Sequence, residues 1–320
     1  MKRAAWVLFV FAFPAQAYVR TKNSAGVCIW WPSRARTFQI DSQGTPDAPS
    51  TDVFNAIRLS FQTWGAVSCS DLTFAEEPLS TDPHARIVGF TSGAANHNLV
   101  LFRTQACRDV VPADDPCRSS GGCGNTYDCW DEIHGDAVIA STTTTSNRFS
   151  GEIFDSDIEL NNAPAANGTK FTFTATDGPP CVTPLETGCV RIDVQNTVTH
   201  EAGHYLGLDH PPDHPEATMY ASAPSGETSK RTLAADDING ICAIYPRGAA
   251  TVTCGPTDGA LTSQGGGCGC SHDQTGPGTA LAALLLFIHG IRRSRRRPQL
   301  AMRSSTSPPT AMRAQSGIEY

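Results

Sequence analysis

The chain has 320 residues, of which 40% are hydrophobic and 17% charged, so it can bury a sizeable core in one or two domains. Its formal charge of -7 is unevenly distributed. Residues 18–270 carry 15 of the 24 Lys and Arg and 29 of the 31 Asp and Glu, a formal charge of -14. A surface this acidic disfavours nucleic acid and anionic membranes as partners.

Residues 1–17 have the pattern of a secretory signal peptide. Lys2 and Arg3 precede a short apolar run, which ends at Ala15-Gln16-Ala17. The run is too short to span a bilayer comfortably, so a membrane anchor is the weaker interpretation. We expect cleavage before Tyr18 and export out of the cell or to its surface.

The cysteines agree with export. Of twelve, ten lie outside the signal and the C-terminal tail, and an even set in an exported chain predicts disulfides. The alternative is that some of these cysteines bind zinc, but no convincing Cys-x-x-Cys pair supports it. The sequence does not give the pairing; the single pair we favour is Cys181 with Cys189. The ten are Cys28, Cys69, Cys107, Cys117, Cys123, Cys129, Cys181, Cys189, Cys242 and Cys254.

The first third of the chain predicts a helix among strands. Apolar residues recur at helical spacing over 52–67, where Ser50 or Thr51 could cap the helix. Alternating or β-branched runs predict strands, and residues 107–135, with four cysteines, predict a disulfide-stapled surface insertion. The predicted strands are 28–31 with 37–40, 72–74, 85–90, 99–102, 137–143 and 151–161.

The central motif is H-E-x-x-H-x-x-G-x-x-H over residues 200–210. His200 and His204 lie one turn apart on a predicted helix, Val194 to Leu206, which Asp193 can cap. Gly207 permits the left-handed turn that returns His210 as a third ligand. Three nitrogens leave one position open on a zinc ion, the arrangement of a catalytic site, and Glu201 is placed to meet a zinc-bound water. The alternative is a surface helix with scattered histidines.

Residues 233–246 predict a last helix. Acids in its first turn, Asp236 and Asp237, suit the helix dipole, and we expect them also to support the turn around Met219. A lone Met usually fills a core, but this one follows the third histidine by nine residues. Residues 248–270 are rich in Gly, Thr and Ser and predict a linker after a domain spanning 18–247.

The zinc motif with Met219 resembles the metzincin metallopeptidases. Four stretches resemble the matrixins among them: 56–74, 155–161, 200–220 and 233–245. This resemblance implies an α/β (α+β) fold with a twisted, mixed five-stranded sheet, an active-site helix and a C-terminal helix. It also implies a zinc endopeptidase, acting as a monomer on polypeptides, with His200, His204 and His210 as ligands, Glu201 as catalytic base and Met219 as the supporting Met-turn.

The resemblance carries two further expectations. It implies that the strand 151–161, with apolar and acidic residues alternating, lies at the sheet edge with one face solvated, where an extended substrate can pair. Asp155 and Asp157 could bind calcium, although solvated edge-strand acids are the favoured interpretation. No cysteine-switch propeptide lies between Ala17 and the first strand, so latency of the matrixin kind is not expected.

The C-terminal residues resemble MYXO-CTERM sorting tails of exported bacterial proteins. Cys268-Gly269-Cys270 precedes an apolar run and an arginine cluster within 271–297. By that resemblance the tail anchors the protein in the membrane or envelope; a plain stop-transfer anchor is the alternative. Residues 298–320 are rich in Ser and Pro and predict a disordered tail.

We therefore expect a secreted or surface-anchored zinc endopeptidase. The alternative is an inactive binding or adhesion module that kept the fold. The presence of Glu201 beside all three histidines favours the enzyme, because metal-dependent binding alone does not require the acid.

Overall fold

The computed structural model describes residues 18–255 and 311–319. Its centre is a mixed sheet in the order β10-β5-β6-β4-β2-β3. Four adjacent strands are parallel to one another: β3, β2, β4 and β6. The other two are antiparallel to their neighbours, β5 to β6 and β10 to β5. The predicted five-stranded mixed sheet is confirmed, and β10 adds a sixth strand. The bounds are β2 Ala35–Ile40, β3 Thr73–Glu76, β4 Leu99–Arg103, β5 Val138–Asn147, β6 Ile153–Asn161 and β10 Ala311–Glu319.

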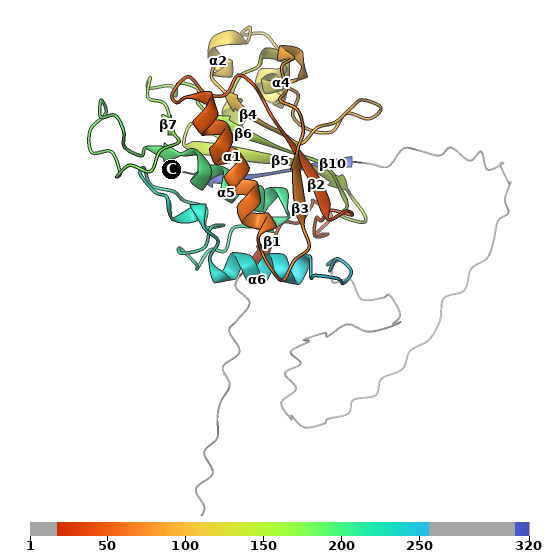
Figure 1. Ribbon diagram of the computed structural model, residues 1–320. Coiled ribbons are helices and arrows are strands. Elements are labelled where there is room, and N and C mark those ends of the chain that lie inside the picture. The colour runs from red at the N-terminus through yellow and green to blue at the C-terminus, as the bar shows by residue number, and fades with distance from the viewer. Residues whose placement is uncertain (1–17, 256–310, 320) are drawn as a thin grey trace, which may run out of the picture. The chain divides into compact units, whose positions relative to one another are not determined.

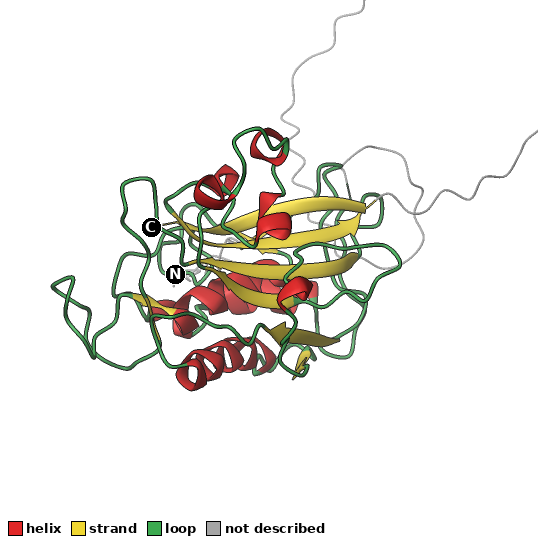
Figure 2. Cartoon of the chain, turned by 90° about the horizontal axis from the view of Figure 1, so that it is seen from above, coloured by secondary structure: helices red, strands yellow, loops and turns green. Residues whose placement is uncertain are grey.

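Two long helices, α1 (Ser50–Gly65) and α5 (Val194–Tyr205), pack against each other and lie on one side of the sheet (Figures 1 and 2). A third, α6 (Ala235–Ile244), lies below them in Figure 1. Short strands pair outside the main sheet, and short helical segments occupy the connections. They are β1 Val19–Arg20, β7 Phe173–Thr174, β8 Ile192–Asp193, β9 Leu208–Asp209, α2 Cys107–Val110, α3 Cys117–Ser120, α4 Cys123–Tyr127, and the 3-10 helices Pro83–Ala85, Glu132–His134 and Ser229–Arg231.

Helix α1 buries the apolar face that its spacing predicts. The expected side-chain cap is wrong: the helix begins at Ser50 directly after Pro49, and neither Ser50 nor Thr51 caps it. The buried face also holds α1 against α5, because the indole N–H of Trp64 donates to the carbonyl of Thr199 in α5 at 2.8 Å. The buried residues of α1 are Val53, Phe54, Ala56, Ile57, Ser60, Phe61 and Trp64.

Helix α5 begins as predicted. The Asp193 carboxylate caps it by accepting from the backbone N–H of Asn196 at 2.7 Å. Two guanidinium nitrogens of Arg231 donate to the same carboxylate, at 2.8 and 2.6 Å. These hydrogen bonds raise the pKa of Arg231. The start of α5 is therefore fixed to the segment that precedes α6.

Three expectations about strands are wrong. The segment 151–161 forms β6, but it lies between β4 and β5 and is buried along nearly its whole length, because β5 covers its outer edge. Residues 85–90 form no strand; Arg86 turns inward instead and pairs with Asp41. Within the tail predicted to be disordered, residues 311–319 form β10, whereas 298–310 lie outside the described residues.

Five disulfides join all ten predicted cysteines, and the favoured pair Cys181–Cys189 is among them. Cys28–Cys254 ties the start of the domain to residues expected to form a linker, so the folded part extends past 247. Cys107–Cys129 and Cys117–Cys123 close the insertion 107–135, as predicted. Cys69–Cys242 joins the segment that follows α1 to α6.

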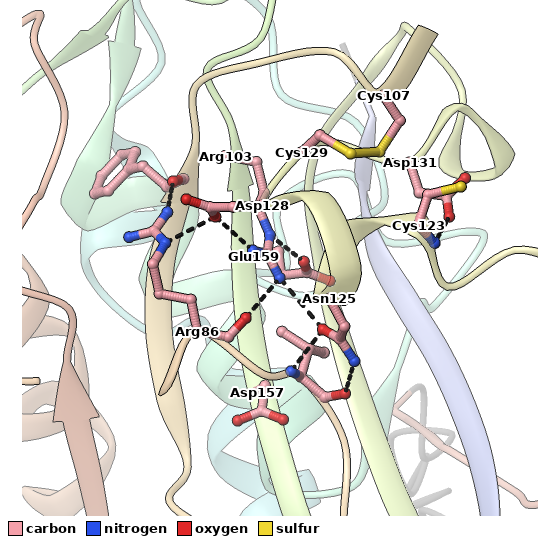
Figure 3. A network of polar contacts seen from close by, with 12 residues as sticks. Arg86, Arg103, Cys107, Cys123, Asn125, Asp128, Cys129, Asp131, Asp157 and Glu159 are labelled. Carbon is pink, nitrogen blue, oxygen red and sulfur yellow. Dashed lines mark hydrogen bonds and ion pairs between the residues drawn. A yellow bond between two sulfur atoms is a disulfide. The ribbon is translucent and has the colours of Figure 1, made fainter. Parts of the chain in front are cut away.

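A buried ionic network fixes this insertion to the sheet (Figure 3). Arg103, at the end of β4, is fully buried and donates at 2.7 Å both to Glu159 of β6 and to Asp128 of the insertion. Arg86 donates to the same Asp128 oxygen at 2.8 Å. Asn125 exchanges two hydrogen bonds with the backbone of Val88. The insertion is thus bound by paired charges to β4 and β6, two inner strands of the sheet.

The predicted signal peptide, residues 1–17, and the predicted anchor segment 271–297 lie outside the described residues. Among the residues that are described, no helix has the length and apolar content needed to cross a bilayer.

Replacing Arg103 by Met should lower the free energy of unfolding by about 3–5 kcal/mol, because it leaves the buried Glu159 carboxylate without its partner. Arg58→Met is the matched control: its pair with Glu76 is solvent-exposed, and its loss should cost about 0–1 kcal/mol. Guanidinium denaturation measures both. Equal losses in the two variants would contradict a structural role for the network.

Candidate metal centre

Three imidazole rings converge at the end of α5. His200 and His204 lie one turn apart on the helix, and His210 returns to them after the chain reverses. Their Nε2 atoms are separated by 3.1 Å (His200 to His204), 3.1 Å (His200 to His210) and 2.9 Å (His204 to His210). In the described part of the chain, this is the one group of three or more His, Cys, Asp or Glu side chains that could hold a metal ion.

Backbone carbonyls orient two of the rings. Nδ1 of His200 lies 2.6 Å from the carbonyl oxygen of Thr218, and Nδ1 of His204 lies 2.8 Å from that of Leu208. A carbonyl only accepts, so each Nδ1 carries the hydrogen and each neutral ring presents a lone pair at Nε2. Burial, together with the neighbouring imidazoles, lowers the pKa of both rings well below the usual value and keeps them neutral.

This arrangement fits a zinc ion. Nε2 of His200 and Nε2 of His204 are both acceptors and face each other at 3.1 Å with no hydrogen between them, which is repulsive unless a cation intervenes. Three nitrogens on one zinc at about 2.0–2.1 Å would lie roughly 3.3 Å apart in tetrahedral geometry. The observed spacings are close to that value, and neutral imidazole is the form that binds zinc.

Gly207 makes the return of His210 possible. Its φ is +91°, in the left-handed region, and a Cβ at this position would lie 2.7 Å from the carbonyl oxygen of Ile29. Beyond it, Leu208 and Asp209 form β9, which pairs with β1. The turn is therefore fixed on both sides before His210 is reached.

Glu201 follows the first histidine and is fully buried. Its Oε2 accepts a hydrogen bond of 2.6 Å from the Thr142 hydroxyl on β5. Nothing in the sequence distinguishes Thr142, because Ser141 to Ser146 is an unbroken run of hydroxyl residues. Only the pairing of β5 in the sheet and its packing on α5 determine which hydroxyl meets the acid.

Met219 lies buried below α5, and Asp237 holds its turn. The Asp237 carboxylate accepts from the backbone N–H of Thr218 at 2.8 Å and of Met219 at 3.1 Å. It also accepts from Ala234 N–H at 2.9 Å, at the start of α6. Of the two acids in the last helix, Asp237 thus supplies the expected polar support. By binding the N–H of Thr218 it also fixes that residue, whose carbonyl orients His200.

The two strand acids considered for calcium are buried rather than solvated. Both carboxylate oxygens of Asp157 accept backbone N–H groups, from Leu99 at 2.8 Å and from Gly89. Burial and the neighbouring Asp155 raise the pKa of Asp157 well above its usual value. A carboxyl that burial disfavours as an anion, and whose oxygens are already engaged, does not support calcium binding.

The matrixin family model matches residues 124–246. The match contains β5, β6, α5, the three histidines, the Met219 turn and α6, and it supports a metzincin-like peptidase domain. The family implies zinc and polypeptide substrates, in agreement with the donor set described above. The resembling residues 56–74 lie outside the matched range.

Gly203 is a sensitive position below the rings. A Cβ there would overlap Sδ of Met219 and lie 3.0 Å from the Trp64 ring. Gly203→Ala should therefore destabilise the protein by about 1–3 kcal/mol through overpacking. The double variant Gly203→Ala/Met219→Ala should lose less than the sum of the two single variants, because each change makes room for the other. Thermal unfolding measures all three; strictly additive losses would contradict the contact.

Proposed function

We propose that this protein is a zinc-dependent endopeptidase. The observation that carries the proposal is the convergence of three imidazole nitrogens within 3.1 Å of one another, with the buried acid Glu201 following the first histidine on the same helix. The matrixin match over 124–246, which includes these residues, also supports it. In this proposal His200, His204 and His210 bind the metal, and Met219 supports them from below.

Zinc, when bound, supplies a Lewis acid that polarises the scissile carbonyl and makes water more acidic. The Glu201 carboxylate accepts a proton from the attacking water and then delivers it to the amine nitrogen as the C–N bond breaks. The Thr142 hydroxyl fixes one oxygen of that carboxylate at 2.6 Å, so the acid does not need to be oriented during the reaction. No side chain has to serve as a nucleophile.

The second candidate function is an inactive metal-holding module for binding or adhesion. A binding role requires the three histidines but gives no reason for a buried carboxylate beside them, with a hydroxyl donor of its own from another element. Burying a charge without a functional need is costly. This observation favours the enzyme.

The five disulfides suggest an extracellular environment. We propose that residues 1–17 direct export, that the peptidase domain begins at residue 18, and that 271–297 anchor the chain at the cell surface. We further propose that the enzyme acts as a monomer. N-terminal sequencing of secreted protein tests the cleavage before Tyr18.

Glu201→Gln should retain one zinc per chain and lose at least about a hundredfold in kcat on an unfolded polypeptide, because the amide keeps an oxygen for Thr142 but cannot accept the proton. The matched control is Glu216→Gln, an exposed acid near the motif, which should leave kcat unchanged. Cleavage of casein by Glu201→Gln at the wild-type rate would refute the assignment of the base.

Removing the metal should abolish cleavage without unfolding the domain, since five disulfides and the apolar core remain. Dialysis against a chelator should eliminate activity, and about one equivalent of zinc should restore it. His210→Ala should weaken zinc binding strongly, measured by metal titration, while His214→Ala should not, because His214 is not one of the three converging rings. Full activity in the metal-free protein would exclude the proposed mechanism.

A further inference from the structure

Residues from near the C-terminal end of the chain occupy one edge of the sheet. β10 lies antiparallel to β5, with register partners running from Ala311 with Asn147 to Glu319 with Val138 (blue in Figure 1). Without β10, β5 would be the outermost strand on this side of the sheet. Its backbone N–H and C=O groups would then be unpaired along one side and open to another extended chain.

The two edges of the sheet differ in how they are protected. At the far edge, β3 is only four residues long and ends with Glu76. On the side covered by β10, β5 is ten residues long and contains neither a charged residue nor a proline. Proteins normally blunt an exposed edge with short strands, charges or prolines. β5 has none of these features, which favours a surface built to receive a strand.

The receiving edge lies beside the candidate metal centre. Ser316 is the register partner of Thr142, and Thr142 donates to the Glu201 carboxylate. Neighbouring strands are about 4.8 Å apart, so the backbone around Ser316 runs one strand spacing from the residue that holds the acid. β10 also runs close to α5, the helix that carries His200 and His204.

We propose that residues 311–319 form an autoinhibitory strand in the chain before it is anchored through 271–297. They occupy the edge of β5 at which an extended polypeptide would have to pair in order to reach the metal centre, so the enzyme is restrained until the segment is displaced or removed. This inference rests on the proposed peptidase function and adds a regulatory element to the same site.

The tether makes such an occupant effective. The 55 residues 256–310 join β10 to the end of the described domain, and a chain of that length can span well over 100 Å when extended. A segment joined covalently in this way competes intramolecularly, which raises its effective concentration above that of a dilute free substrate. A substrate present at micromolar concentration would therefore compete poorly, even if each strand paired equally well on its own.

Hydrogen exchange tests the pairing without requiring activity. We compare the full chain with a variant that ends at Thr310, both carrying Glu201→Gln to prevent self-cleavage. In the full chain, the β5 amides that face β10 should exchange at least about tenfold more slowly than in the shortened variant. Amides of β4, which does not contact β10, are the internal control. Equal exchange of the β5 amides in the two proteins would overturn the placement of the strand.

Activity tests the inhibition. With Glu201 intact, the variant ending at Thr310 should show at least about a tenfold higher kcat/KM on an unfolded polypeptide than the full chain, if β10 is seated about nine-tenths of the time. A full-length chain with 311–319 replaced by a Gly-Ser sequence of equal length should match the shortened variant. A synthetic peptide of residues 311–319 should inhibit the shortened variant competitively. Equal kcat/KM for the full and shortened chains would overturn the proposal.

The two failures can be told apart. If neither chain cleaves any polypeptide with zinc bound, the peptidase function fails and inhibition fails with it, while hydrogen exchange still decides where β10 lies. If the full and shortened chains both cleave at the same rate, the peptidase function stands and only the inhibitory role of β10 is lost.

Discussion

The candidate metal centre depends on two nitrogen lone pairs, on Nε2 of His200 and Nε2 of His204, that the fold holds facing each other. The carbonyl oxygens of Thr218 and Leu208 accept hydrogen bonds from Nδ1 of His200 and of His204, which leaves two acceptor Nε2 atoms 3.1 Å apart in a buried site. That arrangement is unfavourable without a cation, so the fold must supply the free energy that holds it. The supports are distant in sequence: Asp237 fixes the turn at Thr218, and Gly207 allows the turn that presents Leu208. The candidate metal centre is therefore a product of α5, α6 and their connection together rather than of one helix.

Glu201 is positioned from the sheet, by a residue of β5. Glu201 lies on the same helix as the histidines, but its hydrogen-bond donor comes from β5, and the helix itself is held by Trp64 from α1. The histidines and the acid thus depend on different partners. A change in the sheet can displace the acid while leaving the rings in place, and a change in α6 can do the reverse. Such separate supports suit the proposed function, because a bound metal and a base would each have to keep its own geometry.

Much of this was predictable because it depends on local spacing. The helix over 194–206, its Asp193 cap and the buried face of α1 follow from periodicity and capping chemistry, whereas the five-stranded mixed sheet was implied by the resemblance to the matrixins. The order of the strands was predicted wrongly for 151–161, because alternation of apolar and acidic residues indicates an edge only when nothing neutralises the acids. Here Arg103 pairs with Glu159 and backbone amides bind Asp157, so an acidic strand is buried. Thr142 and the pairing of 311–319 with β5 depend on contacts distant in sequence, and local pattern carries no signal for them.

β5 joins the metal centre to the edge of the sheet. One side chain of this strand holds the acid, while its outer backbone groups pair with β10. An extended chain added at this edge forms the same kind of hydrogen bonds whatever its side chains are, because the backbone supplies them. The segment 311–319 and a substrate polypeptide would therefore compete for one surface with similar gross interactions, and the tether, rather than a better fit, decides between them. Regulation by such a strand needs no change in the metal centre itself: it needs only that the linked segment can leave the edge, or be cut away, while β5 and Thr142 remain where they are.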